Sequence, residues 1–163
     1  MFTNKSEKNF LFSHLNNNQK VLEYGSGEST LEISKIVKTV LSIEHQKKWY
    51  EEISKKIPSN VDLILREPNL PYIEGGNCGT YDQFKEYVDY PLNHGPFDVI
   101  FIDGRARVSC ASICNKISHK DTLIFVHDFD LKNRKEYIPI LDYLNIIDFC
   151  DTMYKFEIKN GSK

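Results

Sequence analysis

The chain has 163 residues, a formal net charge of -2 and a charged fraction of 27%. This length suits one domain with a full hydrophobic core, and the balanced charge excludes the strongly basic surface of proteins that gather nucleic acid or anionic membrane. We therefore expect one domain over residues 1–163, with residues 1–19 as an N-terminal helical extension, and a small or neutral partner.

The N-terminal residues contain no continuous apolar segment like that of a secretion signal, and no later apolar run is long enough to span a bilayer. The sequence thus predicts a cytoplasmic protein that does not bind membranes. Frequent Lys, Asn and Ile indicate an AT-rich genome, and the location would be the host cytoplasm if the gene is viral.

The four cysteines show neither a CxxC pair nor the Cys and His spacing of a zinc site. Cys110 and Cys114 fall on one face of a predicted helix, together with Ile113 and Ile117. We expect these two thiols to pack in the core rather than to form a disulfide framework or a metal cluster.

Apolar periodicity predicts that strands and helices alternate along the chain. An amphipathic helix over residues 3–17 is expected to lie over the rim of the sheet. Further helices are predicted over residues 28–38, 46–57, 81–90, 105–118 and 136–144. Strands are predicted at residues 21–22, 40–44, 61–65, 97–103, 123–126, 146–149 and 154–158. Residues 68–79 hold two prolines and three glycines, so they are predicted to be irregular.

This alternation is typical of an α/β fold. Parallel strands need crossover connections, and helices of this length provide them on both faces of the sheet. We predict a three-layer, Rossmann-like, doubly wound and mostly parallel sheet with an antiparallel last strand. In such sheets ligands bind beyond the carboxyl ends of the strands, where Glu23, Glu44, Asp103, His127 and Asp128 are all expected.

The segment from Lys20 to Thr30, KVLEYGSGEST, combines a short strand, a glycine-bracketed turn and the start of a helix. Such a turn is expected to leave backbone N–H groups facing outward, and the missing side chains of Gly25 and Gly27 let a bulky ligand approach. Glu23 can then reach a polar or cationic group of that ligand. The alternative is an ordinary strand-to-helix turn of an α/β domain.

Glu44 ends the second predicted strand, 19 residues after Gly25, where a carboxylate can accept hydrogen bonds from both hydroxyls of a ribose. A dinucleotide fingerprint needs a third glycine, and Thr30 occupies that place. Glu23 would also repel a pyrophosphate. A carboxylate there suits a cationic ligand, such as the amino group and sulfonium of S-adenosylmethionine.

The strings VLEYGSGEST, SIEH and FDVIFID, in this order, resemble the class I S-adenosylmethionine-dependent methyltransferases from about Lys20 to the C-terminus. The resemblance implies that the methionine end of the cofactor lies at the glycine turn and its ribose at Glu44. His45 would flank the adenosine pocket. The expected cofactor-binding residues are Glu23, Gly25, Ser26, Gly27, Ser29, Thr30, Glu44, His45 and Asp103.

The fuller strings GSGESTL, SIEHQKKWY, IDGRARVSCA and IFVHDF are similar to a subgroup of small methyltransferase-like proteins. This subgroup is distantly similar to the plant glucuronoxylan 4-O-methyltransferases. The plant enzymes differ after the aspartate, where this chain has Gly104 and Arg105, so their uronic-acid substrate is not carried over.

The predicted catalytic residues are Asp103, His127 and Asp128, at the ends of two neighbouring strands. A sugar hydroxyl is a poor nucleophile until a base takes its proton or a metal acidifies it. These three side chains offer a general-base site or, alternatively, a hard divalent-metal site with two carboxylates and one imidazole. Asp103 as a helix N-cap and His127 as a packed histidine are the structural alternatives.

Acceptor binding is predicted at Arg105 and Tyr81, with the irregular residues 68–79 closing over the pocket or forming a surface loop. Arg107 is expected in a solvated first helical turn, and Trp49 and Tyr50 are expected in the core.

The sequence therefore predicts an S-adenosylmethionine-dependent methyltransferase that O-methylates a glycan, a sugar or another small hydroxylated acceptor. The alternatives are an S-adenosylmethionine-binding module that is inactive or depends on a partner, and an NAD-dependent Rossmann enzyme. A homo-oligomer or a partner subunit could complete the acceptor site. Nucleic acid is disfavoured as acceptor, because no basic stripe is visible and Ile-Asp-Gly-Arg follows the fourth strand instead of an NPPY-like tetrapeptide.

Overall fold

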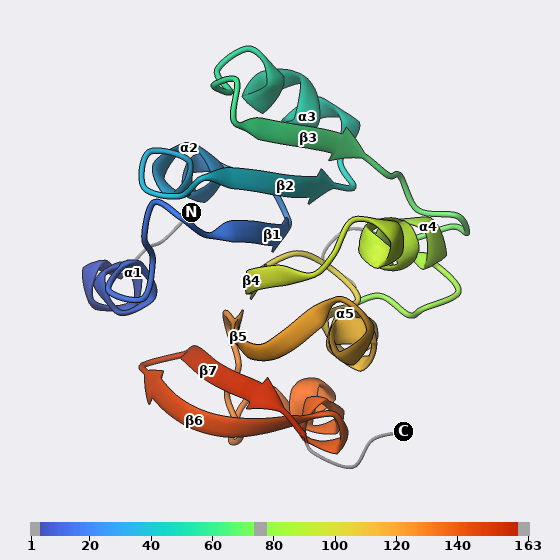
Figure 1. Ribbon diagram of the computed structural model, residues 1–163. Helices are drawn as coiled ribbons and strands as arrows, with labels where there is room; N and C mark the ends of the chain where they lie inside the picture. The colour runs from blue at the N-terminus through green and yellow to red at the C-terminus, as the bar shows by residue number, and fades with distance from the viewer. Residues whose placement is uncertain (1–3, 74–77, 160–163) are drawn as a thin grey trace.

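The structure is a computed structural model, and it describes residues 4–73 and 78–159. One sheet of seven strands has the order β3-β2-β1-β4-β5-β7-β6, from β3 at the top of Figure 1 to β6 at the bottom. The strands are β1 (Lys20–Tyr24), β2 (Thr39–Glu44), β3 (Val61–Leu65), β4 (Phe97–Ile102), β5 (Ser118–Val126), β6 (Leu144–Cys150) and β7 (Met153–Ile158). Strands β1 to β5 pair in parallel, whereas β7 is antiparallel to both β5 and β6. The predicted fold class is confirmed.

Helices cover both faces of the sheet (Figure 1). The α-helices are α1 (Lys5–Phe12), α2 (Glu28–Ile33), α3 (Lys47–Ser54), α4 (Lys85–Asp89) and α5 (Arg107–Ile113), and the 3-10 helices are η1 (Tyr90–Asn93), η2 (Cys114–Lys116) and η3 (Lys135–Asp142). One core joins α1, α2 and α3 to the sheet through Leu11, Ile33 and Ile53. The other core joins α4 and α5 to the opposite face through Tyr87 and Cys110.

Several helices are shorter than apolar periodicity predicts. Helix α5 starts at Arg107 rather than at residue 105, because Ala106 adopts a left-handed conformation with φ of 51°. The helix predicted over residues 136–144 is the 3-10 helix η3, since Pro139 inside it lacks the N–H that an α-helix needs. Helix α2 ends at Ile33, five residues before the predicted end at residue 38.

Two other predictions concern irregular and N-terminal segments. Within residues 68–79, the part that the structure describes contains neither helix nor strand, as predicted, and residues 74–77 lie outside the described residues. The N-terminal helix spans Lys5–Phe12 instead of residues 3–17. It packs on the sheet near β5, where the ring of Phe10 meets the ring of Phe125 edge-on at a centroid distance of 5.9 Å.

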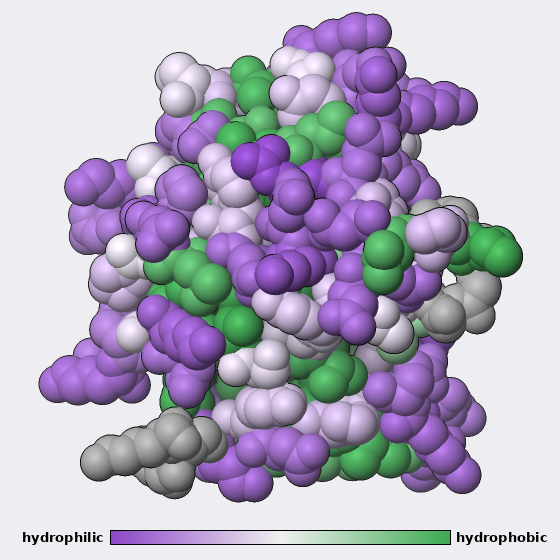
Figure 2. Space-filling view, turned by 90° about the vertical axis from the view of Figure 1, so that its right-hand side faces the viewer, coloured by the Kyte–Doolittle hydropathy of each residue, from purple (hydrophilic) through white to green (hydrophobic). Residues whose placement is uncertain are grey.

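The four cysteines are free, and Cys110 and Cys114 are buried in the core as predicted. Strands β2 and β3 point toward the face of the molecule in Figure 2, where hydrophilic residues predominate and apolar residues form separate small groups. Among residues 4–73 and 78–159, no helix has both the length and the apolar character to cross a membrane.

Candidate active site

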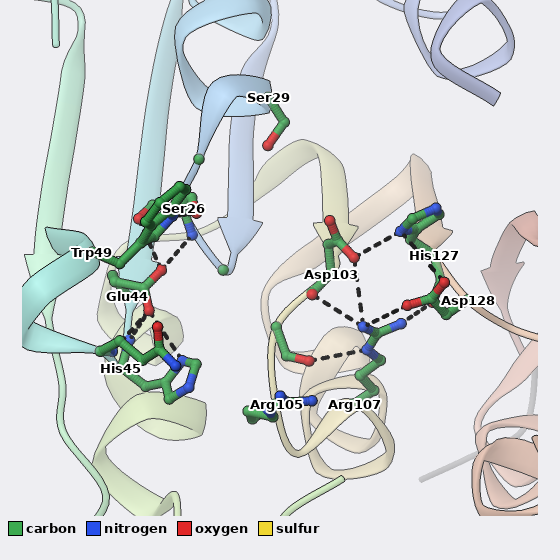
Figure 3. A pocket seen from close by; sticks show the side chains of 14 residues that line it. Ser26, Ser29, Glu44, His45, Trp49, Asp103, Arg105, Arg107, His127 and Asp128 are labelled. Carbon is green, nitrogen blue, oxygen red and sulfur yellow. Dashed lines mark hydrogen bonds and ion pairs between the residues drawn. The ribbon is translucent and has the colours of Figure 1, made fainter. Parts of the chain in front are cut away.

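A pocket of about 460 Å³ lies at the carboxyl ends of β1, β2, β4 and β5. Its position is where the strand order reverses between β1 and β4, the place where open α/β sheets bind ligands. The lining residues are Gly25, Ser26, Gly27, Ser29, Glu44, His45, Gln46, Trp49, Asp103, Gly104, Arg105, Arg107, His127 and Asp128. Figure 3 shows two polar groups on opposite sides of the pocket, one around Glu44 and one around Asp103.

The glycine turn between β1 and α2 uses its own N–H groups within the protein. The N–H of Gly25 donates to the carbonyl of Ile43, and that of Gly27 donates to Thr30 Oγ1, each at 2.9 Å. The N–H of Ser26 donates to Glu44 Oε2, also at 2.9 Å. The prediction that N–H groups of this turn face outward is wrong for these three, because neighbouring strand and helix residues supply acceptors.

The carboxylate of Glu44 lies at the end of β2 and is almost fully buried. Besides the Ser26 N–H, its Oε2 accepts a hydrogen bond from Ser26 Oγ at 2.9 Å, and its Oε1 accepts the N–H groups of His45 and Gln46, each at 2.8 Å. Burial is the largest influence on the pKa of Glu44 and raises it, but the hydrogen bonds and the charge of His45 outweigh burial and lower the pKa. Glu44 is therefore an anion held on the pocket wall.

Glu23 lies behind the pocket wall. Its side chain is fully buried in β1 and accepts hydrogen bonds from the hydroxyls of Ser29 and Thr30, each at 2.5 Å, and of Ser42 at 2.7 Å. Burial raises the pKa of Glu23 to about 7, although the three hydroxyls oppose this effect. Ser29 stands between this carboxylate and the pocket, whereas Thr30 is buried and does not line it. Direct contact of Glu23 or Thr30 with a cofactor stays a prediction.

The second polar group contains the three predicted catalytic residues. Asp103 follows β4, and His127 and Asp128 follow β5, so the parallel pairing of these strands places them together. Asp103 Oδ1 lies 2.8 Å from His127 Nδ1, and His127 Nδ1 lies 4.0 Å from Asp128 Oδ1. All three line the pocket, as does Arg105, while the Tyr81 hydroxyl donates to Asp89 at 2.7 Å and Tyr81 does not line the pocket.

Arg107, in the first turn of α5, connects the residues that follow β4 with those that follow β5. Its guanidinium donates to the carbonyls of Gly104 at 3.0 Å and Asp103 at 3.1 Å, and to the carbonyl of His127. It also lies 3.3 Å from Asp128 Oδ2 and 3.5 Å from Asp103 Oδ1. The prediction of a solvated Arg107 is wrong, because these acceptors from two strand ends hold the side chain in a buried position.

Trp49 contributes to the pocket as well as to the core. Its indole Nε1 donates to the carbonyl of Ser26 at 2.5 Å, so α3 clamps the glycine turn. The same side chain packs against the core between the sheet and α1 to α3, as does Tyr50. The core prediction is correct for Tyr50 and incomplete for Trp49. The helical spacing of Trp49 with apolar neighbours predicts core packing, and it does not indicate that Trp49 also lines a pocket.

The residue that sequence reasoning missed entirely is Glu7, in α1. Its Oε2 lies 3.2 Å from His127 Nε2, and its Oε1 accepts the N–H and the hydroxyl of Thr152 at 2.8 and 2.7 Å. Glu7 is buried although it sits in an amphipathic helix of an N-terminal extension. A buried carboxylate needs compensating donors, and no local pattern announces donors from β5 and the β6–β7 turn.

No known family profile matches this sequence, and no curated protein has a significantly similar one. The fold has solved counterparts. A methyltransferase-like protein from Silicibacter pomeroyi aligns with a TM-score of 0.72 at 20% identity, over 98% of this chain and 88% of that one. A candidate methyltransferase from Streptococcus mutans, in complex with S-adenosylhomocysteine (SAH), aligns with a TM-score of 0.61 at 13% identity, over 98% of this chain and 100% of that one.

A third counterpart is the MycE methyltransferase of the mycinamycin biosynthetic pathway, solved with Mg, SAH and mycinamycin VI. It aligns with a TM-score of 0.59 at 15% identity, over 93% of this chain and 44% of that one. At these identities the likeness concerns the fold. The chain therefore has the α/β fold of solved methyltransferase structures, with its pocket at the strand ends where such folds bind ligands.

Proposed function

We infer that this protein is an S-adenosylmethionine-dependent methyltransferase that acts on a sugar or another small hydroxylated acceptor. The observation that carries this proposal is one pocket with Glu44 and the glycine turn on one side and Asp103 on the other. Solved structures of the same fold, two of them in complex with SAH, support the cofactor.

The charges of the pocket favour a cationic nucleoside over a dinucleotide. A pyrophosphate is bound by free N–H groups at a glycine turn, and here the N–H groups of Gly25, Ser26 and Gly27 already have acceptors inside the protein. Glu44 and Asp103 add negative charge to the same pocket. NAD therefore fits less well than a ligand with an ammonium and a sulfonium group.

Asp103 is the residue best placed to take a proton from the acceptor. Its Oδ1 faces His127 and Arg107, while no other described residue bonds its Oδ2, which Figure 3 shows pointing away from that group. When bound, S-adenosylmethionine would supply a methyl group on a sulfonium, already activated for in-line displacement by the acceptor oxygen. Asp103 would orient the hydroxyl and receive its proton, and Glu44 would hold the ribose.

A divalent metal at Asp103, His127 and Asp128 is the alternative for activating the hydroxyl. One ligand atom from each residue lies within 4.8 Å of the others. Two of the three, however, are bonded to one another, and the Arg107 guanidinium lies within 3.5 Å of both carboxylates. A divalent cation would have to break the hydrogen bond between Asp103 and His127, and the Arg107 guanidinium would repel it. We therefore favour proton transfer without a resident metal.

The pocket lining favours a polar acceptor. Among its described residues, Trp49 has the one large apolar side chain, and Asp103, Arg105, His127 and Asp128 contribute polar groups. This lining suits a hydroxylated molecule better than a lipid or an aromatic ring. The resemblance to glucuronoxylan 4-O-methyltransferases, the glycan acceptor and a homo-oligomer or partner subunit stay predictions.

Calorimetric titration with SAH tests the cofactor. We expect binding by the wild-type protein and at least tenfold weaker binding by Glu44→Ala, with exposed Glu28→Gln as the control that also removes one carboxylate. Binding of NAD in place of SAH would overturn the proposal and favour a dehydrogenase or epimerase.

A screen of sugar nucleotides and glycans with radiolabelled S-adenosylmethionine tests the acceptor. Transfer of label to a hydroxylated compound is the expected result. SAH binding without transfer to any of them, alone or with candidate partner proteins, would favour a cofactor-binding module.

A further inference from the structure

We propose that Glu7 of the N-terminal helix is a positioning residue for the pocket, which acts by holding His127 against Asp103. This inference deepens the proposed function, because Asp103 is its predicted proton acceptor. Two contacts link the three side chains in the order Glu7, His127, Asp103, from α1 to the pocket.

Both ring nitrogens of His127 face a carboxylate. Nδ1 lies 2.8 Å from Asp103 Oδ1, and Nε2 lies 3.2 Å from Glu7 Oε2. Glu7 is itself held at its other oxygen by two donors of Thr152. The imidazole ring is thus fixed at both ends, and its side chain is only 9% exposed. Rotation of the ring would break both contacts and leave the buried Glu7 carboxylate without its ring partner.

The number of protons that the two contacts need indicates the protonation state of His127. Each contact between a ring nitrogen and a carboxylate oxygen requires one proton between the two atoms, so the two contacts require two protons. A neutral imidazole supplies one of them, and one carboxylate would then have to be protonated. An imidazolium supplies both while both carboxylates stay ionised, and the Thr152 donors suit an ionised Glu7.

The charges around His127 favour the imidazolium. Asp103 follows β4, Asp128 is the next residue after His127, and Glu7 comes from α1. Within residues 4–73 and 78–159, the cation beside this group is Arg107 of α5, which donates to the His127 carbonyl. Burial is the largest influence on the pKa of His127 and lowers it. The hydrogen bond to Asp103 and the charges of Asp103, Asp128 and Glu7 outweigh burial and raise the pKa above 6.5.

The consequence is that the N-terminal helix belongs to the site. With the ring charged and fixed, Asp103 Oδ1 stays bonded to His127, and Oδ2 is the oxygen left for the pocket. Without Glu7, the ring loses its partner at Nε2 and a reason to carry the second proton. Asp103 would then face a neutral imidazole that no carboxylate of α1 holds in place, beside Arg107 at 3.5 Å.

Nitrogen-15 NMR of the histidine rings tests the proposal on the wild-type protein without any assay of activity. The His127 signals are assigned by their loss in His127→Gln. At pH 7.5 we expect both ring nitrogens of His127 to be protonated. A single protonated nitrogen with the shifts of a neutral tautomer would overturn the proposal.

Glu7→Gln tests the effect of the Glu7 charge on His127, because glutamine keeps the size of the side chain and removes its charge. We expect the titration midpoint of His127 to fall by about one pH unit or more. The matched control is Glu32→Gln, which removes a carboxylate that α1 contacts through Lys8 and leaves His127 untouched. An unchanged midpoint in folded Glu7→Gln, or an equal fall in Glu32→Gln, would overturn the role of Glu7.

The same variants separate this inference from the proposed function. If methyl transfer is measured, Glu7→Gln should lower kcat with little change in the KM for S-adenosylmethionine, and the pH profile of kcat should shift. If no transfer is found with any acceptor, the NMR titration still decides whether Glu7 charges His127.

Discussion

Gly25 and Gly104 pack against each other so closely that neither has room for a side chain. A β-carbon on Gly25 would lie 2.8 Å from Gly104 Cα, and one on Gly104 would lie 2.0 Å from the Tyr87 hydroxyl. The backbones of the turns after β1 and β4 are thus in contact at the pocket wall. Gly25 serves this contact between strand ends and also lines the pocket, and its role in ligand approach stays a prediction.

Gly25→Ala should therefore destabilise the fold itself. Gly25 has φ of 93°, which an L side chain rarely adopts, and the added methyl group would collide with backbone. We expect the free energy of unfolding to fall by about 2 kcal/mol or more, measured by urea denaturation. An unfolding midpoint equal to that of the wild type would show that the two turns can separate at no cost.

Gly27→Ala should behave differently. Gly27 has extended backbone with φ of 176°, and the atoms nearest to an added β-carbon belong to Trp49 and Ser29, at 3.7 Å or more. Both of these residues line the pocket. We expect a normally stable protein whose affinity for SAH is at least tenfold weaker, because the methyl group occupies ligand space. Unchanged affinity in calorimetry would place the ligand away from the glycine turn.

Glu23 should make the protein less stable as the pH rises toward neutrality. The folded protein holds the Glu23 proton up to a pKa of about 7, whereas the ordinary pKa of a glutamate side chain is 4.5. Between these pH values the folded state binds more protons than the unfolded state, so stability falls with rising pH, by about 3 kcal/mol in total. Glu23→Gln should lack this contribution. Urea denaturation at pH 4.5, 6 and 7.5 measures this dependence. The free energy of unfolding should fall by the same amount in the wild type and in exposed Glu28→Gln, and it should change less with pH in Glu23→Gln.

Asp103→Asn should abolish methyl transfer and leave SAH binding nearly unchanged. Asparagine preserves the shape of the side chain but cannot accept the hydroxyl proton. The assay is repeated with EDTA and with added Mg²⁺, because activity that depends on Mg²⁺ would favour the metal alternative. Retained turnover in Asp103→Asn would remove this residue from the mechanism.

The sequence by itself determined the alternation of strands and helices and the residues at the strand ends. Hydrophobic periodicity is local, so the run FDVIFID announces a buried parallel strand without any knowledge of its neighbours. Parallel pairing then brings Glu44, Asp103 and His127 to one edge of the sheet. Helix lengths were less predictable, because a single left-handed residue such as Ala106 shortens a helix and leaves its periodicity intact.

Only the tertiary structure decided which polar side chains face the pocket and which face one another. Glu7 and His127 are 120 residues apart in sequence, and Arg107 is buried by carbonyls that follow two different strands. Glu23 and Glu44 look alike at their strand ends, yet one lies behind three hydroxyls and the other lines the pocket. The free energy of burying a polar group depends on partners that packing brings from elsewhere in the chain, and no local pattern encodes those partners.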